Sequence, residues 1–151
     1  MKDRGFKFLL LTMLFIFLSG CGIRKIKPEM RIPSQSILEE TPSEMTKVIF
    51  FNDSNALSSG LDGSAKINLK LNGKAVGSIN IHKYAQLFLS PGTYDLYMAH
   101  FDLFTFESDY KINIGKEDVY IRIYSRTTSN AYEIVKELPG DFKTRYKPFN
   151  Q

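Results

Sequence analysis

Two histidines are the residues of this chain best suited to acid–base chemistry. His82 and His100 fall on different predicted elements, and no HExxH pattern or closely spaced ligand set accompanies them, as a zinc site requires. Nucleophilic catalysis needs a Ser or Thr beside a histidine that a third group orients; only Asp102 lies close to His100 in sequence. Glu107 and Asp109 share the outer face of a predicted strand, but paired carboxylates for glycoside hydrolysis need a cleft, which a solvated strand face does not offer. We therefore expect no catalytic residue, metal or cofactor, with a hydrolase as the alternative.

A second group of side chains has the composition of a binding surface. Ile121 and Ile123 alternate with larger residues in a predicted strand and are expected to face the core. Tyr120, Arg122 and Tyr124, here called the Tyr-Arg face, then project together from the opposite side. Tyr and Arg are enriched at interface hot spots, and they also stack on sugars or pair with acidic groups. The alternative is that a second sheet or the C-terminal tail covers them, because strands favour Tyr in any case.

The segment Asn52 to Gly63 is a predicted loop, rich in Ser, Asn, Asp and Gly. Sandwich proteins often carry recognition on such loops, so it is a second candidate for binding. Asp53 and Asp62 suggest calcium at first sight, but the EF-hand spacing and its closing Glu are absent. The sequence therefore predicts no metal here.

Alternation of apolar and polar residues predicts a series of short strands, most strictly in Thr105 to Ile114. The unbroken apolar run Val48 to Phe51 indicates a central strand covered on both faces. Asn72-Gly73 supplies the two left-handed residues of a type I′ hairpin turn. The pattern predicts an all-β fold, a single antiparallel β-sandwich of about seven strands. The predicted strands are Lys47 to Asn52, Ala65 to Asn72, Lys74 to Ile81, Ala85 to Leu89, Thr93 to Phe101, Thr105 to Ile114, Val119 to Tyr124 and, more weakly, Tyr132 to Leu138.

The N-terminus has the parts of a secretory signal. Lys2, Arg4 and Lys7 precede the apolar run Phe8 to Leu18, and small residues follow it. This run is shorter than the roughly 20 residues that span a bilayer. The only cysteine of the chain, Cys21, comes directly after the small residues.

The run Leu18-Ser19-Gly20-Cys21 resembles a bacterial lipobox. The resemblance implies that the Cys21 thiol takes a diacylglyceryl group, that cleavage follows Gly20, and that the new amino terminus can be acylated. Two or three acyl chains hold a protein stably at a membrane. By resemblance to Gram-negative lipoproteins, Gly22 after the cysteine implies an outer-membrane protein facing the periplasm. The alternative is an uncleaved anchor or an ordinary signal peptide.

These features divide the chain into three parts. Residues 1–20 are the predicted lipoprotein signal peptide, 21–45 the lipidated N-terminus with a flexible Pro-containing tether, and 46–151 the sandwich domain with a short polar, basic C-terminal tail. Of the net charge of +4, +2 belongs to the signal, which leaves +2 for the mature chain. So small a charge, without a clustered basic face, argues against nucleic acid. With Cys21 lipidated, no thiol remains for a disulfide.

Two runs carry a family resemblance. Leu71-Asn72-Gly73-Lys74-Ala75-Val76-Gly77 and Leu87-Phe88-Leu89-Ser90-Pro91-Gly92-Thr93-Tyr94 resemble the bacterial lipoprotein family called domain of unknown function 2846. The same hairpin and PG turn occur in PEGA-type repeats, whose sandwich resembles transthyretin. The resemblance covers roughly Lys47 to Leu138 and departs in the longer segment Ser78 to Tyr84. Because that family has no settled activity, it implies a fold and a lipid anchor rather than a chemistry.

The sequence thus predicts a lipid-anchored protein of the bacterial envelope that acts as a non-catalytic binding or structural module. The expected partners are the membrane, through the lipid on Cys21, and a protein or glycan of the envelope. The alternatives are a hydrolase of envelope polymer, which needs a histidine and carboxylates in one pocket, and an inhibitor or immunity-type lipoprotein that binds through an exposed edge strand.

Overall fold

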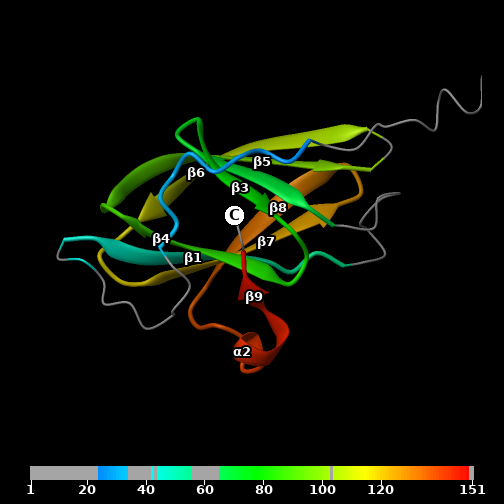
Figure 1. Ribbon diagram of the computed structural model, residues 1–151. Coiled ribbons are helices and arrows are strands. Elements are labelled where there is room, and N and C mark those ends of the chain that lie inside the picture. The colour runs from blue at the N-terminus through cyan, green and yellow to red at the C-terminus, as the bar shows by residue number, and fades with distance from the viewer. Residues whose placement is uncertain (1–23, 34–41, 43, 56–64, 103, 150–151) are drawn as a thin grey trace, which may run out of the picture.

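Two sheets packed face to face form the protein in a computed structural model that describes residues 24–33, 42, 44–55, 65–102 and 104–149 (Figure 1). The predicted β-sandwich is confirmed, with nine strands in the described residues rather than about seven. The five-stranded sheet has the order β8 (Ser129–Val135), β7 (Val119–Arg126), β1 (Thr46–Asn52), β4 (Lys83–Leu89), β9 (Lys147–Pro148). The four-stranded sheet has the order β3 (Lys74–Ile79), β2 (Ile67–Leu71), β5 (Gly92–Phe101), β6 (Thr105–Ile114). The predicted signal peptide 1–20 and Cys21 lie outside the described residues.

Strand β1 is central, as its apolar run predicts. Val48, Ile49, Phe50 and Phe51 are all buried, because the second sheet covers one face and the C-terminal segment covers the other. The pairing differs from a purely antiparallel sandwich, since β1 runs antiparallel to β4 but parallel to β7. Alternation reports which face of a strand is buried and carries no information about the direction of its neighbours.

The hairpin of β2 and β3 has the predicted turn. Asn72 and Gly73 have φ values of +48° and +76°, the two positive values that a type I′ turn requires. Opposite Leu69, Gly77 has φ +140°, next to a shift in the β2–β3 register. A Cβ atom on Gly77 would lie 2.6 Å from the ring of Phe149, so this glycine admits the C-terminal residues onto β3.

The main core lies between the sheets and is entirely aliphatic and aromatic. Its members include Phe50 of β1, Leu69 of β2, and Leu96 and Met98 of β5, each fully buried. Ile121 and Ile123 of β7 belong to this core, which confirms that they point inward.

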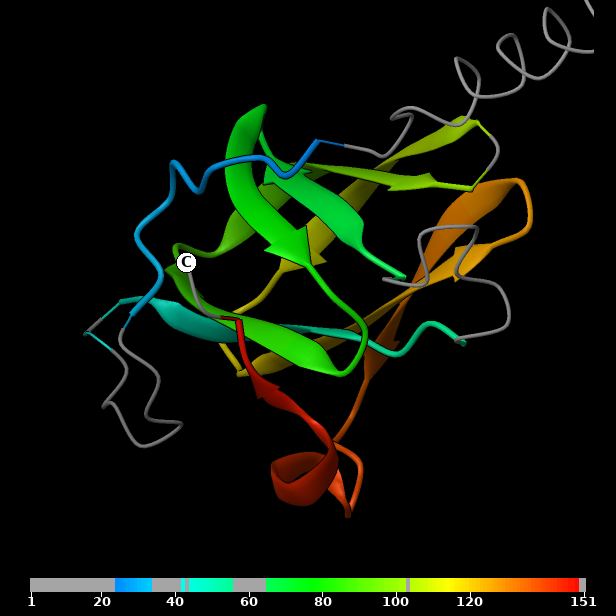
Figure 2. The ribbon, with the colours of Figure 1, turned by 45° about the vertical axis from the view of Figure 1, so that its right-hand side comes forward.

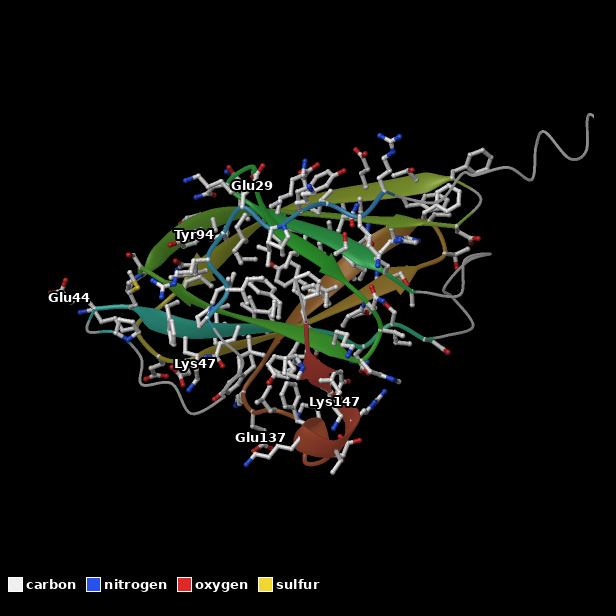
Figure 3. The ribbon with its side chains drawn as sticks, in the orientation of Figure 1. Glu29, Glu44, Lys47, Tyr94, Glu137 and Lys147 are labelled. Atoms are coloured by element: carbon white, nitrogen blue, oxygen red, sulfur yellow. The ribbon has the colours of Figure 1, made fainter. Side chains whose placement is uncertain are left out.

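A second apolar cluster covers the outer face of the five-stranded sheet, where the sequence predicted only a polar tail. The one-turn helix α2 (Phe142–Arg145) places Phe142 against Phe51 and Tyr84, with ring centroids 5.7 and 5.1 Å apart. Tyr146 follows and packs on Phe51 at 5.2 Å. Burying one such ring contributes about 1.5–3 kcal/mol, which is enough to hold a short segment in place. The labelled Glu137 and Lys147 mark this segment beneath the sheet (Figure 3).

The described part of the predicted tether is not a free coil. The segment 24–33 lies along β3, where the Glu29 and Met30 amides donate to the Ala75 carbonyl at 2.8 and 3.1 Å. The Ile26 amide donates to Ser78 Oγ at 2.9 Å, and Met30 packs against the main core. In Figure 2 this blue segment runs over the green strands. The unpaired edge of β3 supplies hydrogen-bond groups that a composition-based prediction of coil does not consider.

On the opposite side of the sandwich, buried polar groups join β8 to β5 and β6. Asn130 is 1% exposed, and its Nδ2 donates to the carbonyls of Met98 and Phe106 at 3.2 and 3.0 Å. The Tyr110 hydroxyl donates to the Asn130 carbonyl. These bonds tie the edge strand of one sheet to the other sheet. No helix among the described residues is long and apolar enough to cross a membrane.

Candidate functional site

The Tyr-Arg face projects from the outer side of β7, as the alternation predicts, but its three members have different surroundings. Tyr120 is half-buried and packs against the second apolar cluster together with Val135 and Leu138. The C-terminal segment therefore covers this end of the face. Arg122 and Tyr124 lie farther along the strand and remain partly exposed.

The Arg122 guanidinium is fixed by two carboxylates. Its Nε donates to Asp53 Oδ2 at 2.8 Å, and its NH1 group donates to Glu133 Oε2 at 3.3 Å. Burial lowers the pKa of Arg122, but the nearby negative charges of Asp53 and Glu133 outweigh this effect and raise the pKa above its ordinary value. Arg122 is thus a fixed cation within the fold.

Asp53 is the centre of this arrangement. Its side chain is 14% exposed, and Oδ1 accepts hydrogen bonds from the Tyr146 hydroxyl at 2.6 Å and from the Arg145 guanidinium at 2.7 Å. Asp53, Arg122, Arg145 and Tyr146, here called the Asp53 cluster, connect the end of β1, strand β7 and the C-terminal segment. The Asp53 carboxylate accepts hydrogen bonds from two guanidinium groups and one hydroxyl, so its hydrogen-bonding capacity is largely used within the fold. This favours a structural role for the Asp53 cluster.

We expect the Tyr146 hydroxyl to stabilise the fold only below strongly alkaline pH. Burial raises the pKa of Tyr146, and the hydrogen bond to Asp53 and its charge raise it further, so the folded state holds the proton longer than the unfolded chain. The stabilisation is therefore complete below pH 10 and declines as pH rises above it. Urea unfolding should show that Tyr146→Phe lowers the free energy of unfolding by about 1.5 kcal/mol at pH 8.

The difference between wild type and Tyr146→Phe should then shrink between pH 10 and 11.5. Tyr84 and Tyr97, whose pKa values burial also raises, titrate in both proteins and cancel in this difference. A difference that stayed constant over the same range would contradict the assigned hydrogen bond.

Tyr124 lies between two guanidinium groups at the exposed end of the face. The guanidinium carbons of Arg122 and Arg126 lie 5.1 and 5.4 Å from the centre of its ring. Arg126 is exposed and donates to the Tyr124 hydroxyl at 3.2 Å. Within the described chain, no carboxylate pairs with Arg126. A cation stacked on an aromatic ring, with donors directed to solvent, can receive an acidic or planar group.

The two histidines lie in different parts of the molecule. His100 is 2% exposed, bonds through Nδ1 to Asn130 Oδ1 at 2.8 Å and stacks on Phe106. His82 lies 3.3 Å from the Arg145 guanidinium through Nε2, and its ring packs edge-on against Tyr146. Within the described chain, the imidazole rings of both histidines thus contact amide, guanidinium and aromatic groups.

The carboxylates considered for catalysis are solvated. Glu107 and Asp109 are exposed on β6, opposite Ala99 and Tyr97 of β5. Burial, followed by the hydrogen bond and charge of Glu107, raises the pKa of Tyr97 to about 12. No group of three or more metal-ligating side chains occurs among the residues that the structure describes.

The predicted loop Asn52 to Gly63 begins inside the fold. Asn52 is fully buried, and its Nδ2 donates to the carbonyls of Ala65 and Ile79 at 2.6 and 2.8 Å. Its Oδ1 accepts from the Ser54 amide and hydroxyl at 3.0 and 2.6 Å. Residues 56–64, including Asp62, lie outside the described residues.

Sequence reasoning missed most of the Asp53 cluster. In the sequence, Asp53 suggests only calcium, which the spacing excludes, and Arg145 and Tyr146 belong to the predicted tail. One signal was present, because Phe142 and Tyr146 stand four positions apart, the spacing of one helical face. The ion pairs themselves join positions up to 92 residues apart, and no local pattern encodes them.

Comparisons of the chain with protein-family models, with curated proteins and with solved structures found no match.

Proposed function

We propose that this protein is a lipid-anchored, non-catalytic binding module of the bacterial envelope. In this proposal the lipid on Cys21 holds the sandwich at the outer membrane, facing the periplasm. The exposed part of the Tyr-Arg face, Tyr124 with Arg126 beside it, contacts an envelope protein or glycan. The resemblance to the lipobox and to the lipoprotein family supports the anchor, and the geometry of β7 supports the binding face.

The observation that carries the binding proposal is the Tyr124 ring in contact with two guanidinium groups, that of Arg122, which two carboxylates fix, and that of Arg126, which pairs with no carboxylate of the described chain. Arg122 is immobilised by Asp53 and Glu133, so Tyr124 is ordered before any ligand arrives. Arg126 keeps donors for an incoming carboxylate, phosphate or peptide carbonyl. Binding to such a preorganised pair loses little side-chain entropy, which favours affinity.

The experiment is crosslinking and capture from intact cells. Wild type is compared with Tyr124→Ala/Arg126→Ala, which leaves the Asp53 cluster and the covered Tyr120 intact. We expect capture of one specific partner by wild type and at least a tenfold loss in the double variant, as removal of two hot-spot residues implies.

The chain offers a matched control on the other sheet. Lys70 lies over the ring of Tyr97 at 5.2 Å, so Lys70→Ala/Tyr97→Ala also removes one cation and one aromatic ring. This variant should capture the partner as well as wild type does. Equal capture by all three proteins would exclude Tyr124 and Arg126 and direct attention to the loop Asn52 to Gly63.

A second candidate function is inhibition of another protein through an edge strand. Strand β8 is an edge of the five-stranded sheet, and its Ile134 is 50% exposed. Ile134 and Lys136 line a hollow of about 740 Å³ with the β6–β7 turn. Substitution of Ile134 by Lys should abolish capture if this edge, rather than Tyr124, is the contact.

A further inference from the structure

The two ends of the described chain form a basic pocket on the sheet edge at β3. It has a volume of about 430 Å³ and is lined by Lys25, Lys27, Lys83, Ser78, Asn80 and Phe149, among others. We call it the terminal pocket. Ligand sites in proteins commonly have volumes of about 300–1,000 Å³, so this one is large enough for a small polar group.

The walls of the terminal pocket are fixed by hydrogen bonds and packing. Ile26, which stands between two of the lysines, donates its amide to Ser78 Oγ at 2.9 Å. Asn68 Nδ2 donates to the Arg24 carbonyl at 2.9 Å, on the other side of Lys25. At the opposite wall, the Phe149 amide donates to the Tyr84 carbonyl at 2.7 Å. The positions of the lysine backbones are therefore set before any ligand binds.

Three lysines line the terminal pocket, and no carboxylate among the described residues pairs with them. Within the described chain, Lys25, Lys27 and Lys83 make no ion pair. The nearest acid along the segment is Glu29, whose Oε2 accepts the Ala75 amide at 2.9 Å. Like charges in one pocket repel each other, and a bound anion removes this repulsion. Lysine ammonium groups bind phosphate as compact point charges.

The place of the terminal pocket in the chain indicates the source of that anion. Ile26 is five positions after Cys21, so the pocket lies within about 17 Å of the cysteine even if the chain between them is fully extended. If Cys21 carries lipid, as proposed above, the pocket is at headgroup level. Each basic residue near an anionic membrane surface contributes about 1 kcal/mol. The Phe149 ring adds an apolar wall suited to the carbons of a headgroup.

We propose that the terminal pocket binds the phosphate of an anionic phospholipid headgroup next to the lipid anchor. This inference rests on the proposed anchor for its ligand source, and it fixes the orientation of the sandwich. The edge at β3 then faces the bilayer, and Tyr124 is presented by the other sheet.

The test uses the full mature chain in dodecyl maltoside micelles, titrated at 150 mM salt and followed by amide chemical shifts of Ile26, Ser78 and Asn80. The probes are dihexanoyl phosphatidylglycerol, dihexanoyl phosphatidylcholine and inorganic phosphate. We expect saturable shifts with phosphatidylglycerol and no shifts with phosphatidylcholine. Inorganic phosphate should bind at least tenfold more weakly than phosphatidylglycerol. Equal or tighter binding of inorganic phosphate would identify a free-phosphate site instead, and shifts with none of the probes would overturn the proposal.

Two charge-matched variants separate the terminal pocket from general attraction. Lys25→Gln/Lys27→Gln/Lys83→Gln should weaken phosphatidylglycerol binding at least tenfold. The control removes three exposed lysines elsewhere, Lys116, Lys136 and Lys143, and should change it less than twofold. Equal losses in both triple variants would overturn the proposal. The titration does not need lipid on Cys21, so a negative result would overturn the headgroup site and not the proposed lipid anchor. Lipid labelling tests the anchor separately.

Discussion

Replacing Asn52 by Leu is expected to lower the free energy of unfolding by about 4 kcal/mol. The Asn52 side chain makes four hydrogen bonds at a fully buried position, two of them to carbonyls of Ala65 and Ile79. Leu fills a similar volume but leaves these carbonyls unsatisfied, and each buried unsatisfied group costs about 1–3 kcal/mol. Since small domains are stable by only about 5–15 kcal/mol, the midpoint of urea unfolding should fall sharply.

Two further variants provide smaller expected losses in the free energy of unfolding for comparison. Ser54→Ala removes one donor to Asn52 and the acceptor of the Ser125 amide, so we expect a smaller loss of about 1–2 kcal/mol. Asn113→Leu changes an exposed position of β6 and should stay within about 0.5 kcal/mol of wild type. If the Asn52 and Asn113 substitutions had equal effects, the assigned hydrogen bonds of Asn52 to Ala65 and Ile79 would be wrong.

Most of the sandwich could be predicted because its strands and turns leave local patterns in the sequence. Thr105 to Ile114 alternates apolar and polar residues except at Ser108, and the strand has those bounds in the structure. Asn72-Gly73 fixes the β2–β3 hairpin because few other residues accept two positive φ values. In both cases the structure depends on residues that are neighbours in the sequence, so the sequence alone indicates it.

What could not be predicted depends on contacts between distant segments. The parallel pairing of β1 with β7, and of β4 with β9, follows from how the sheets close. The segment 24–33 has the composition of a linker, yet it is ordered by the edge of β3. Gly77 of the same strand also leaves room for the ring of Phe149, so two segments with little local pattern, 24–33 and the C-terminal segment, both pack on β3.

The candidate site was predicted only in part, because local alternation reports the face of a strand and not its contacts with distant segments. Alternation in β7 correctly places Tyr120, Arg122 and Tyr124 on one face. It does not report that the C-terminal segment covers Tyr120, or that Asp53 and Glu133 engage Arg122. The structure leaves Tyr124 and Arg126 as the accessible pair, so a variant that removes Arg122 would confuse loss of stability with loss of binding.

Replacing Cys21 by Ser is expected to abolish both lipid labelling and membrane retention. Each acyl methylene buried in a bilayer contributes about 0.8 kcal/mol, so two or three acyl chains anchor the protein stably. A protein without acyl chains lacks this anchor. Cys21 is the only cysteine, so no other thiol can accept the lipid. Without the anchor, the three lysines of the terminal pocket contribute only about 1 kcal/mol each, which is screened at physiological salt.

Metabolic palmitate labelling combined with membrane fractionation of wild type, Cys21→Ser and a Ser34→Ala control tests the lipid anchor. We expect label and membrane retention in wild type and in the control, and loss of both in Cys21→Ser with the domain still folded. A Cys21→Ser protein that still carried label and still fractionated with membranes would contradict the lipid anchor and, with it, the placement of this sandwich in the envelope.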